Sequence, residues 1–354
     1  MANPSQDKQK RSVSESHAGN DFPIFAALDL GTNNCRLLIA RPIVTKDGSG
    51  PGIKVVDTFS RIVRLGEGLS VSNQFLPEAM SRTLAALKTC QKKIEKSSAV
   101  MMRYVATEAC RQAANSREFL EQVRKETGLE IEIVSNEEEA KLAFLGCSSL
   151  LGPQAENAVV FDIGGGSTEF MWVKRDTMAP PELMCEHRII DWLSLNQGVM
   201  NLSEKFGGTA FAEMYFDELV GHLVKTLRGF DRKNKISEAV AAGNVHMLST
   251  SGTLTTVAAI HLGLSRYERS RIDGVTFSVD ELRDAGQEII AMRPSERFSN
   301  ACIGPERSDY IISGCAIFEA ICTLWPISRI TIADRGVREG IIISLMHEYM
   351  RQKI

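Results

Sequence analysis

The sequence predicts an α/β protein built from two similar domains that face each other across a cleft. The first observation is an apolar run at 157–163 that contains Asp162 and leads into three glycines and two hydroxyl residues. The second is a similar run at 24–30 that contains Asp29 and also leads into a turn of glycine and hydroxyl residues. The third is the length of 354 residues, which favours two domains. Two related strand–turn units far apart in one chain indicate a repeated domain.

The composition is that of an ordinary globular protein. Hydrophobic residues make up 44% of the chain, which supports a sizeable core. The net charge of −3 gives no general attraction to nucleic acid or to an acidic membrane surface. No apolar run approaches the length of about 18 residues that a membrane-spanning helix needs. We therefore expect neither nucleic acid nor a membrane as a partner.

The cysteines indicate a reducing compartment. The chain has eight of them, scattered and without a C-x-x-C pair, and its first residues form no apolar signal segment. Thiols of this kind stay reduced in the cytoplasm, so we expect a cytoplasmic protein in which most cysteines fill the core.

Domain I is expected at 22–138, after a polar tail at 1–21 that we expect to be disordered. Its first strand, 24–30, is expected to pair in a hairpin with 36–41. The residues at 46–52 are rich in turn formers and predict a link.

A strand is predicted at 60–66, where charged and apolar residues alternate and place Arg61 and Arg64 on one face. This face is either a solvated edge or a basic lining for a polyanion, and the pattern leaves both open.

Helices and strands alternate through the rest of domain I. Pro77 opens a helix at 77–96, and a buried strand follows at 100–106. A second helix is expected from Ser116 to Gly128, and a strand at 131–134.

Arg111 follows the strand at 100–106 directly. The carboxyl ends of strands are where α/β proteins usually bind ligands. Arg111 therefore either contacts a ligand or forms a salt bridge to a neighbouring helix.

The acidic segment Ser135 to Lys141 opens a further helix. Asn136 can cap this helix, and Glu139 then stands at the spacing of a capping box. On this interpretation Glu139 only stabilises its own helix end, and Glu137 and Glu138 complement the helix dipole.

Domain II is expected at 139–336, and the helix at 337–350, within 337–354, could return to complete domain I. The expected elements of domain II are strands at 157–163, 168–174 and 186–192, helices at 209–229, 252–262, 279–291 and 307–323, and a last strand and turn at 330–336.

The glycine turn after Asp162 predicts a phosphate and metal site. Glycines bring bare N–H groups against a ligand, and Ser167 and Thr168 add hydroxyl donors. Asp162 and Glu169 flank the turn and could hold a hard cation such as Mg²⁺. The alternative is a glycine-rich hairpin turn with Glu169 in solvent. No Gly-Lys-Ser/Thr sequence follows, so the turn is not a Walker A loop.

Two further segments add to this pattern. A short apolar run at 247–249 leads into a hydroxyl-rich turn that opens a helix at Gly252, and helix N-termini bind anions. The segment 265–271 carries Arg266, Arg269 and Arg271, and is either a surface loop or a contact for a long polyanion.

Together these motifs resemble those of the exopolyphosphatase/guanosine pentaphosphate phosphohydrolase family. The resemblance is carried by Asp29-Leu30-Gly31-Thr32-Asn33, Asp162-Ile163-Gly164-Gly165-Gly166-Ser167-Thr168-Glu169, Thr250-Ser251-Gly252-Thr253 and Arg338-Glu339-Gly340, and it extends from about Phe22 to the C-terminus. It implies two actin-like (ribonuclease H-like) domains that face each other across a central cleft. The chain is similar to the short, two-domain form, because the longer members carry a further C-terminal domain.

The resemblance also implies roles for single residues. Glu139 matches the proposed general base of the family, and Arg111 matches an arginine that contacts the substrate phosphate. It implies Mg²⁺ or Mn²⁺ held by Asp162 and Glu169, with Asp29 acting through water, and a homodimer. The residues expected to bind phosphate are Gly31, Thr32, Asn33, Gly164, Gly165, Gly166, Ser167, Thr168, Ser251, Gly252 and Thr253. The expected polyanion groove comprises Arg61, Arg64, Arg266, Arg269 and Arg271.

Four functions remain open on the sequence alone. The first is release of terminal orthophosphate from inorganic polyphosphate, favoured by the basic stretches outside the motifs. The second is hydrolysis of guanosine pentaphosphate, with guanosine tetraphosphate as product. The third is a kinase or ATPase, for which no adenosine or acceptor motif is present. The fourth is a non-catalytic module that binds these guanosine phosphates, which the three retained carboxylates disfavour.

Overall fold

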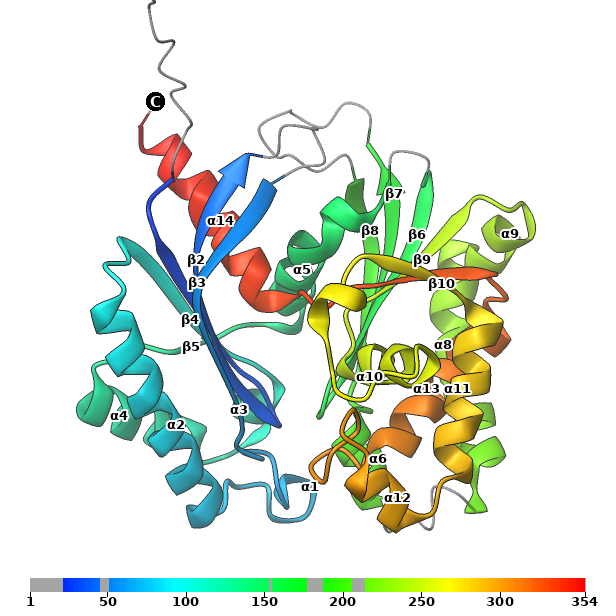
Figure 1. Ribbon diagram of the computed structural model, residues 1–354, viewed down its shortest axis with the longest axis horizontal. Helices are drawn as coiled ribbons and strands as arrows, with labels where there is room; N and C mark the ends of the chain where they lie inside the picture. The colour runs from blue at the N-terminus through cyan, green and yellow to red at the C-terminus, as the bar shows by residue number, and fades with distance from the viewer. Residues whose placement is uncertain (1–21, 45–50, 153–154, 177–186, 206–213, 354) are drawn as a thin grey trace, which may run out of the picture.

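The computed structural model describes residues 22–44, 51–152, 155–176, 187–205 and 214–353. These residues form two lobes, each built on one β-sheet, with two helices between the sheets (Figure 1). The predicted tail at 1–21, most of the link at 46–52 and Cys185 lie outside the described residues.

The first sheet has the strand order β3-β2-β1-β4-β5 in the described part of the chain. Strands β1 to β3 form an antiparallel meander, and β4 and β5 continue the sheet parallel to β1. The strands are β1 (Phe25–Leu30), β2 (Asn34–Val44), β3 (Pro51–Ile62), β4 (Met101–Ala106) and β5 (Glu132–Ile133). The helices of this half are α1 (Leu69–Ser72), α2 (Pro77–Lys96), α3 (Glu108–Gln112), α4 (Ser116–Thr127) and α5 (Asn136–Cys147), and a 3₁₀ turn, η1, follows at Ser148–Leu150.

The second sheet repeats this plan with one added strand. Its order is β10-β11-β9-β6-β7-β8 among the described residues, so β6, β7 and β8 form the meander, and β9 and β11 continue parallel to β6. The strands are β6 (Asn157–Ile163), β7 (Thr168–Arg175), β8 (His187–Leu195), β9 (Val245–Ser249), β10 (Val275–Ser278) and β11 (Arg329–Ile332). The helices are α6 (Val199–Lys205), α8 (Phe216–Asn234), α9 (Ile236–Ala241), α10 (Gly252–His261), α11 (Val279–Ala291), α12 (Pro294–Ser299), α13 (Ile311–Leu324) and α14 (Val337–Arg351), with a 3₁₀ turn, η3, at Arg269–Arg271. The predicted fold class, two actin-like α/β domains facing each other, is confirmed.

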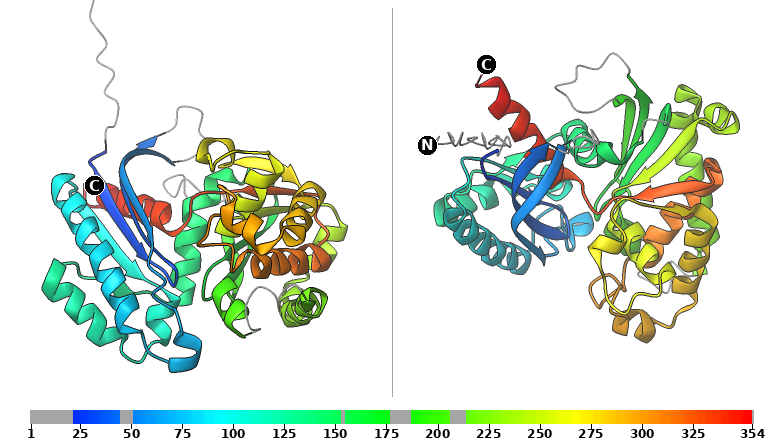
Figure 2. Two further views of the ribbon diagram at one scale, coloured as in Figure 1. Left: turned by 60° about the horizontal axis from the view of Figure 1, so that its bottom comes forward. Right: turned by 45° about the horizontal axis from the view of Figure 1, so that its top comes forward.

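Helices α5 and α14 lie side by side between the two sheets, as both views in Figure 2 show. The C-terminal helix α14 packs its isoleucines, Ile341 to Ile343, against Phe25 and Leu38 of the first sheet. Helix α5 packs Phe144 against the second sheet. Each sheet therefore has a helix of its own at the junction, and the two helices meet there.

The two junction helices approach closely because each has a glycine at the contact. A Cβ on Gly340 of α14 would lie 1.9 Å from the carbonyl oxygen of Leu142 on α5, and a Cβ on Gly146 would lie 2.1 Å from the carbonyl oxygen of Gly336. A larger residue at either position would push the helices apart.

The predicted strand at 60–66 is wrong in its bounds, because β3 ends at Ile62. The N–H groups of Val63 and Arg64 both donate to the carbonyl oxygen of Asn33, at 2.8 and 3.0 Å, which turns the chain out of the sheet. Arg64 consequently adopts a left-handed conformation with φ of 48°. Arg61 is in the strand and Arg64 is not, so they share no strand face.

Two predicted helices begin later than expected. Helix α8 begins at Phe216 rather than at 209, and residues 206–213 lie outside the described part. Helix α13 begins at Ile311 rather than at 307, because a turn at 307–310 precedes it.

Two predictions from the composition concern the cysteines and the absence of a membrane-spanning helix. Seven of the eight cysteines are described, and all seven are buried and free of disulfide bonds. None of the described helices combines the length and the apolar character needed to cross a membrane.

Candidate active site

A pocket lies between the two sheets, at the turns that connect β1 to β2 and β6 to β7. Its wall is mostly polar and comes from both domains. The lining residues that sequence reasoning predicted are Asp29, Gly31, Thr32, Asn33, Glu139, Asp162, Gly164, Gly165, Gly166, Ser167, Gly252 and Thr253. Arg111, Thr168, Glu169 and Ser251 were also predicted and lie just outside the lining.

The two glycine turns touch each other across the pocket. The turn between β6 and β7 is closed by a hydrogen bond from the N–H of Gly164 to the carbonyl oxygen of Ser167, at 2.9 Å. A Cβ on Gly166 would lie 2.8 Å from the hydroxyl oxygen of Thr32, and one on Gly165 would lie 3.4 Å from the Cβ of Thr32. Bare glycine backbone is therefore what allows the two domains to approach this closely.

Several helices begin at the pocket, among them α5, α10 and α14. Glu139 lies in the first turn of α5, Gly252 begins α10 and Val337 begins α14, and all three residues line the wall. Helix N-termini present unpaired N–H groups and a partial positive charge, which suit phosphate oxygens. Ser251 caps α10, because its hydroxyl accepts from the N–H of Thr253 at 3.0 Å.

Asp29 and Asp162 are half-buried and line the pocket. Burial raises the pKa of Asp29, while the positive charges of Arg36 and Arg338 lower it. Burial also raises the pKa of Asp162 to about 6, and Arg36 and the hydroxyl of Thr250 oppose this shift. Both carboxyls therefore lack enough positive charge nearby to offset their removal from water.

The two hairpins differ in charge at one equivalent position. Arg36 lies directly opposite Asp29 in the β1–β2 pair, and Glu169 lies directly opposite Asp162 in the β6–β7 pair. Glu169 accepts a hydrogen bond from the hydroxyl of Ser194 at 3.0 Å. Burial raises the pKa of Glu169 to about 7, and Asp162 adds to the shift.

Sequence reasoning missed the arginines of the pocket. Arg36 and Arg307 line it, and the buried Arg338 acts on Asp29. Burial lowers the pKa of Arg307 and of Arg338, and the positive charge of Arg36 lowers both further. The three positive charges are therefore crowded together. The signal for Arg36 was available, because it follows Asp29 at the same spacing at which Glu169 follows Asp162.

The pocket consequently brings arginines and carboxylates together. Arg36 and Arg307 line it along with the carboxylates Asp29, Asp162, Glu108 and Glu139. Burial raises the pKa of Glu139 most, and the negative charge of Glu169 raises it further.

Glu139 does not cap its own helix, so the capping-box interpretation is wrong. The cap of α5 is Ser135, whose hydroxyl accepts from the N–H of Glu138 at 3.2 Å. The carboxylate of Glu139 instead accepts from Nη2 of Arg111 at 2.7 Å and lines the pocket. The interaction with Arg111 lowers the pKa of Glu139 against the effect of burial.

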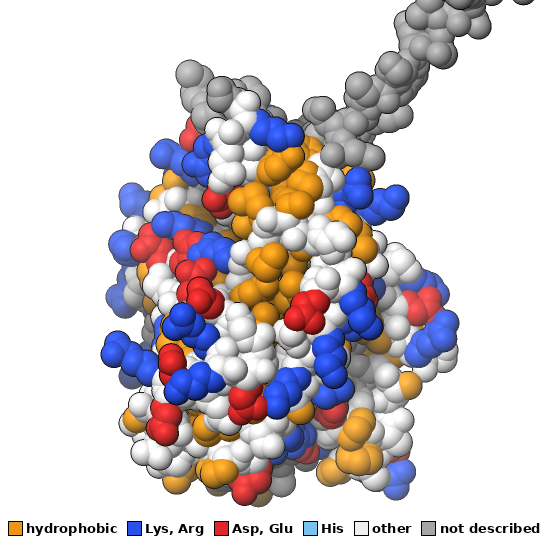
Figure 3. Space-filling view, turned by 90° about the vertical axis from the view of Figure 1, so that its left-hand side faces the viewer, with side chains coloured by type: hydrophobic (Ala, Val, Ile, Leu, Met, Phe, Trp, Pro, Cys, Tyr) orange, Lys and Arg blue, Asp and Glu red, His pale blue; other side chains and the backbone are white. Residues whose placement is uncertain are grey.

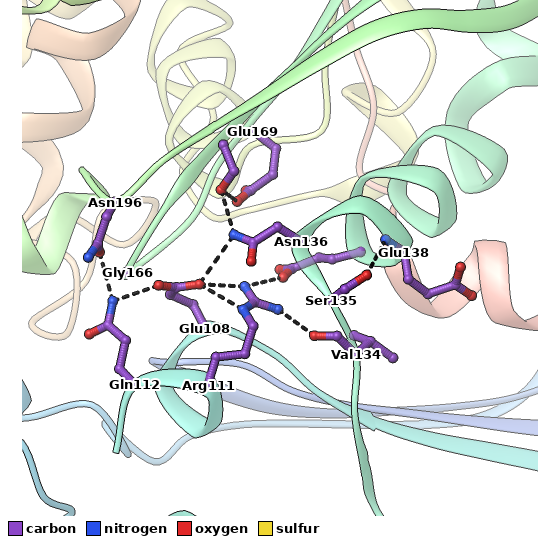
Figure 4. Close-up of polar contacts among 12 residues, drawn as sticks. Glu108, Arg111, Gln112, Val134, Ser135, Asn136, Glu138, Gly166, Glu169 and Asn196 are labelled. Atoms are coloured by element: carbon purple, nitrogen blue, oxygen red, sulfur yellow. Dashed lines mark hydrogen bonds and ion pairs between the residues drawn. The ribbon is translucent and has the colours of Figure 1, made fainter. Parts of the chain in front are cut away.

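Arg111 is not a lining residue of the pocket, and its guanidinium is hydrogen-bonded to Glu108 and Val134 (Figure 4). Its Nε and Nη2 donate to Glu108 at 2.8 and 2.6 Å, its Nη1 donates to the carbonyl oxygen of Val134 at 2.8 Å, and its Nη2 also donates to Glu139. A guanidinium carries five N–H groups, and the protein engages four of those of Arg111. In this state Arg111 holds Glu139 rather than a ligand.

The five predicted groove arginines do not line the pocket. Arg64 comes nearest, because its guanidinium lies 5.9 Å from the ring centre of Tyr310, a lining residue. Arg61 lies over Phe59, and Arg269 pairs with Glu339 at 3.2 Å. Arg266 and Arg271 are exposed, so these side chains remain candidates for a polyanion outside the pocket.

Known proteins are similar to this chain over most of its length. Residues 43–349 match the Ppx/GppA phosphatase family. The Exopolyphosphatase 2 of Mycobacterium tuberculosis is 28% identical over 334 residues, which are 90% of this chain and 98% of the relative. A Bifunctional 3-dehydroquinate synthase/phosphatase of Fusobacterium nucleatum is 30% identical over 328 residues, which are 92% of this chain and 46% of the relative.

Solved structures share the fold. The crystal structure of an exopolyphosphatase-like protein has a TM-score of 0.80 at 24% identity and covers 93% of this chain and 99% of its own. The Aquifex aeolicus Ppx/GppA family member has a TM-score of 0.71 at 24% identity, with coverage of 92% and 98%.

Proposed function

Because the chain belongs to the Ppx/GppA phosphatase family, we propose that it is an exopolyphosphatase that releases terminal orthophosphate from inorganic polyphosphate. The observation that carries the proposal is the make-up of the pocket wall. Glycine turns and helix N-termini form this wall, and the charged side chains of Arg36, Arg307 and Glu139 line it.

The terminal phosphoryl group is placed between the two glycine turns. The N–H groups of Gly165 and Gly166 and the hydroxyls of Thr32, Ser167 and Thr253 hold its oxygens. The next phosphates extend toward Arg36 and Arg307, whose charges are otherwise crowded together. Phosphoryl transfer depends mainly on such positioning and electrostatics.

Glu139 acts as the general base. It takes a proton from a water molecule whose oxygen attacks the terminal phosphorus, and the bond from that phosphorus to the bridging oxygen breaks. The bridging oxygen leaves with the shortened chain, and orthophosphate is the other product. Arg111 keeps Glu139 ionised and oriented, since its hydrogen bond at 2.7 Å favours the charged carboxylate.

The residues present fit a hard divalent cation, Mg²⁺ or Mn²⁺. Burial raises the pKa values of Asp29, Asp162 and Glu169, so the site lacks positive charge that such an ion would supply. No group of three or more His, Cys, Asp or Glu side chains among the described residues is arranged to enclose a metal by itself. This agrees with Mg²⁺, which usually takes one or two carboxylates and fills its remaining positions with water and substrate phosphates. When bound, the ion would neutralise charge on the phosphoryl group.

Guanosine pentaphosphate is the competing substrate, since it would use the same residues. The apolar or aromatic side chains of the lining are Tyr310, Ile311, Val337, Val199 and Ile163, and the other lining residues are polar, charged or glycine. A guanine base needs a flat apolar platform, whereas a phosphate chain needs positive charge. The balance of the lining therefore supports polyphosphate.

The test is phosphate release from long polyphosphate, guanosine pentaphosphate and ATP, each with and without Mg²⁺. Glu139→Gln is expected to lower kcat on polyphosphate by about 10²–10⁴-fold, the usual contribution of a general base. Glu137→Gln is the matched control, because Glu137 is in the same helical turn and pairs with Lys141 at the surface.

Three results would contradict the proposal. Faster turnover of guanosine pentaphosphate would assign the enzyme to that substrate with the same chemistry. Full activity of Glu139→Gln would show that Glu139 is not the general base. Tight binding of guanosine tetraphosphate with no hydrolysis of any substrate would indicate a binding module. A homodimer stays a prediction, which light scattering can test.

A further inference from the structure

Glu108 is a carboxylate that the proposed reaction does not use, although it lines the pocket. It begins α3, and only 11% of its side chain is exposed. A negative charge on the wall of a pocket for phosphate chains repels the substrate. Its presence there needs a reason that outweighs this repulsion.

The contacts of Glu108 with Arg111 give the first part of that reason. Its Oε2 accepts from both Nε and Nη2 of Arg111, at 2.8 and 2.6 Å. Such a two-point contact fixes the plane of the guanidinium. The same Nη2 donates to Glu139, so the orientation of the base depends on where Glu108 holds Arg111.

Glu108 also connects the two domains across the cleft. The amide of Asn136 donates to Oε2 of Glu108 at 3.4 Å and to the hydroxyl of Ser194 at 2.7 Å, and that hydroxyl donates to Glu169 (Figure 4). Glu108 is therefore connected to the base Glu139 through Arg111. It is connected to the carboxylate Glu169 through Asn136 and Ser194.

A second connection leads to the glycine turn. The amide of Gln112 donates to Oε1 of Glu108 at 2.6 Å and to the side-chain oxygen of Asn196 at 2.7 Å. The amide of Asn201 donates to the same oxygen of Asn196 at 2.9 Å and to the carbonyl oxygen of Gly166 at 2.7 Å.

We propose that Glu108 is a positioning residue that orients Glu139 through Arg111 once the two domains have closed on the terminal phosphate. The inference rests on the proposed function, because it takes Glu139 as the base. When the cleft opens, Glu108 separates from Asn136 of α5, and Gln112 separates from Asn196 in the turn after β8, so Glu108 loses the contacts that fix it. Glu139 is therefore held in its reactive orientation only while the two domains enclose a terminal phosphate.

The test measures kcat and KM for tripolyphosphate with Glu108→Gln, Glu139→Gln and the double variant. Glu108→Gln keeps the size of the side chain but removes its charge. We expect kcat to fall about 10–100-fold, as for residues that orient a reacting group. We expect KM to fall or stay unchanged, because a repelling charge leaves the pocket wall. A role in folding alone would not lower KM.

The double variant tests whether Glu108 acts through Glu139. Residues that act as a unit are not additive, so the double variant should be no slower than Glu139→Gln alone. Glu137→Gln is the control for loss of a nearby charge. If Glu108→Gln unfolds near the assay temperature, Glu108→Asp replaces it, since it keeps the charge and shortens the reach.

The outcomes separate the two proposals. The inference is overturned if Glu108→Gln keeps kcat within about twofold while Glu139→Gln is impaired, or if the two losses multiply in the double variant. Full activity of Glu139→Gln removes the base itself, and the proposed reaction fails together with the inference.

Discussion

The protonation of Glu139 is governed by opposing influences within a few contacts. Burial raises its pKa most, the charge of Glu169 adds to this, and Arg111 lowers it. The reaction needs the ionised form, so activity is lost as the pH falls through the pKa of the folded enzyme. The acidic limb of the pH–rate profile therefore reports how well Arg111 is held.

Replacing Arg111 with Gln should shift that limb. The change removes the positive charge that lowers the pKa of Glu139, so the pKa rises and the acidic limb of kcat moves to higher pH. At the optimum, kcat should also fall by about tenfold or more, because Glu139 loses its hydrogen-bond donor. A profile measured from pH 5 to 9 on polyphosphate checks this. A limb that stays in place would show that Arg111 does not control the base.

Arg36 is the pocket arginine that the sequence pattern could have revealed. Arg36→Gln should raise KM for tripolyphosphate by about 10-fold or more, the effect of losing one charged hydrogen bond to phosphate. Arg188→Gln is the control, since Arg188 is 68% exposed on β8. An unchanged KM for Arg36→Gln would mean that the chain leaves the pocket on another side.

Site residues were predictable where they lie within a local motif. The glycine turns and Glu139 are contiguous in sequence with the strand or helix that presents them, so their place at the cleft follows from the fold. Arg307 reaches the pocket through tertiary packing alone, and nothing near it in the sequence differs from an ordinary surface loop. Glu108 could have been found, because it stands at the carboxyl end of the strand at 100–106, as Arg111 does.

At the level of the elements, the contact of α5 with α14 fixes how the two domains are joined. Gly340→Ala should lower the free energy of unfolding by about 1–3 kcal/mol, because its methyl group would overlap the backbone of α5. Gly221→Ala on α8 is the matched control. A Cβ there meets no atom within 4 Å, and alanine favours a helix. Thermal unfolding of both variants should show a lower Tm only for Gly340→Ala, and equal values would refute the tight contact.

The elements themselves were predictable to different degrees. Helix 77–96 was bounded correctly because Pro77 marks its start and Ser97 ends it. The strand at 60–66 was misplaced because the hydrogen bonds to Asn33 that end β3 come from a distant turn. Alternation of charged and apolar residues continues past Ile62, although the chain has already left the sheet.

For the whole molecule, the distribution of surface charge bears on how a long polyanion could approach. The side of domain I drawn in Figure 3 shows an apolar strip flanked by Lys and Arg interspersed with Asp and Glu, so this face offers no continuous basic path. Outside the pocket lining, Arg64 offers a positive charge at the edge of the pocket, because its guanidinium lies 5.9 Å from the ring centre of Tyr310.

Arg64→Gln should therefore affect long substrates more than short ones. We expect KM for long polyphosphate to rise about two- to fivefold, the effect of one exposed charge, with little change for tripolyphosphate. Arg293→Gln, which removes an exposed charge from α12, should change neither value. Equal effects of Arg64→Gln on both substrates would place Arg64 at the terminal phosphate instead.

The difference between Arg36 and Glu169 has a consequence for the direction in which a substrate enters. The two ends of linear polyphosphate are chemically identical, so the substrate itself does not determine in which direction the chain extends from the pocket. Two identical hairpins would bind it equally well in either sense, and half of the bound chains would face away from the attacking water. Placing a cation in one hairpin and a carboxylate in the other breaks that symmetry. Under the proposed function, each bound chain would therefore lie with its inner phosphates toward Arg36.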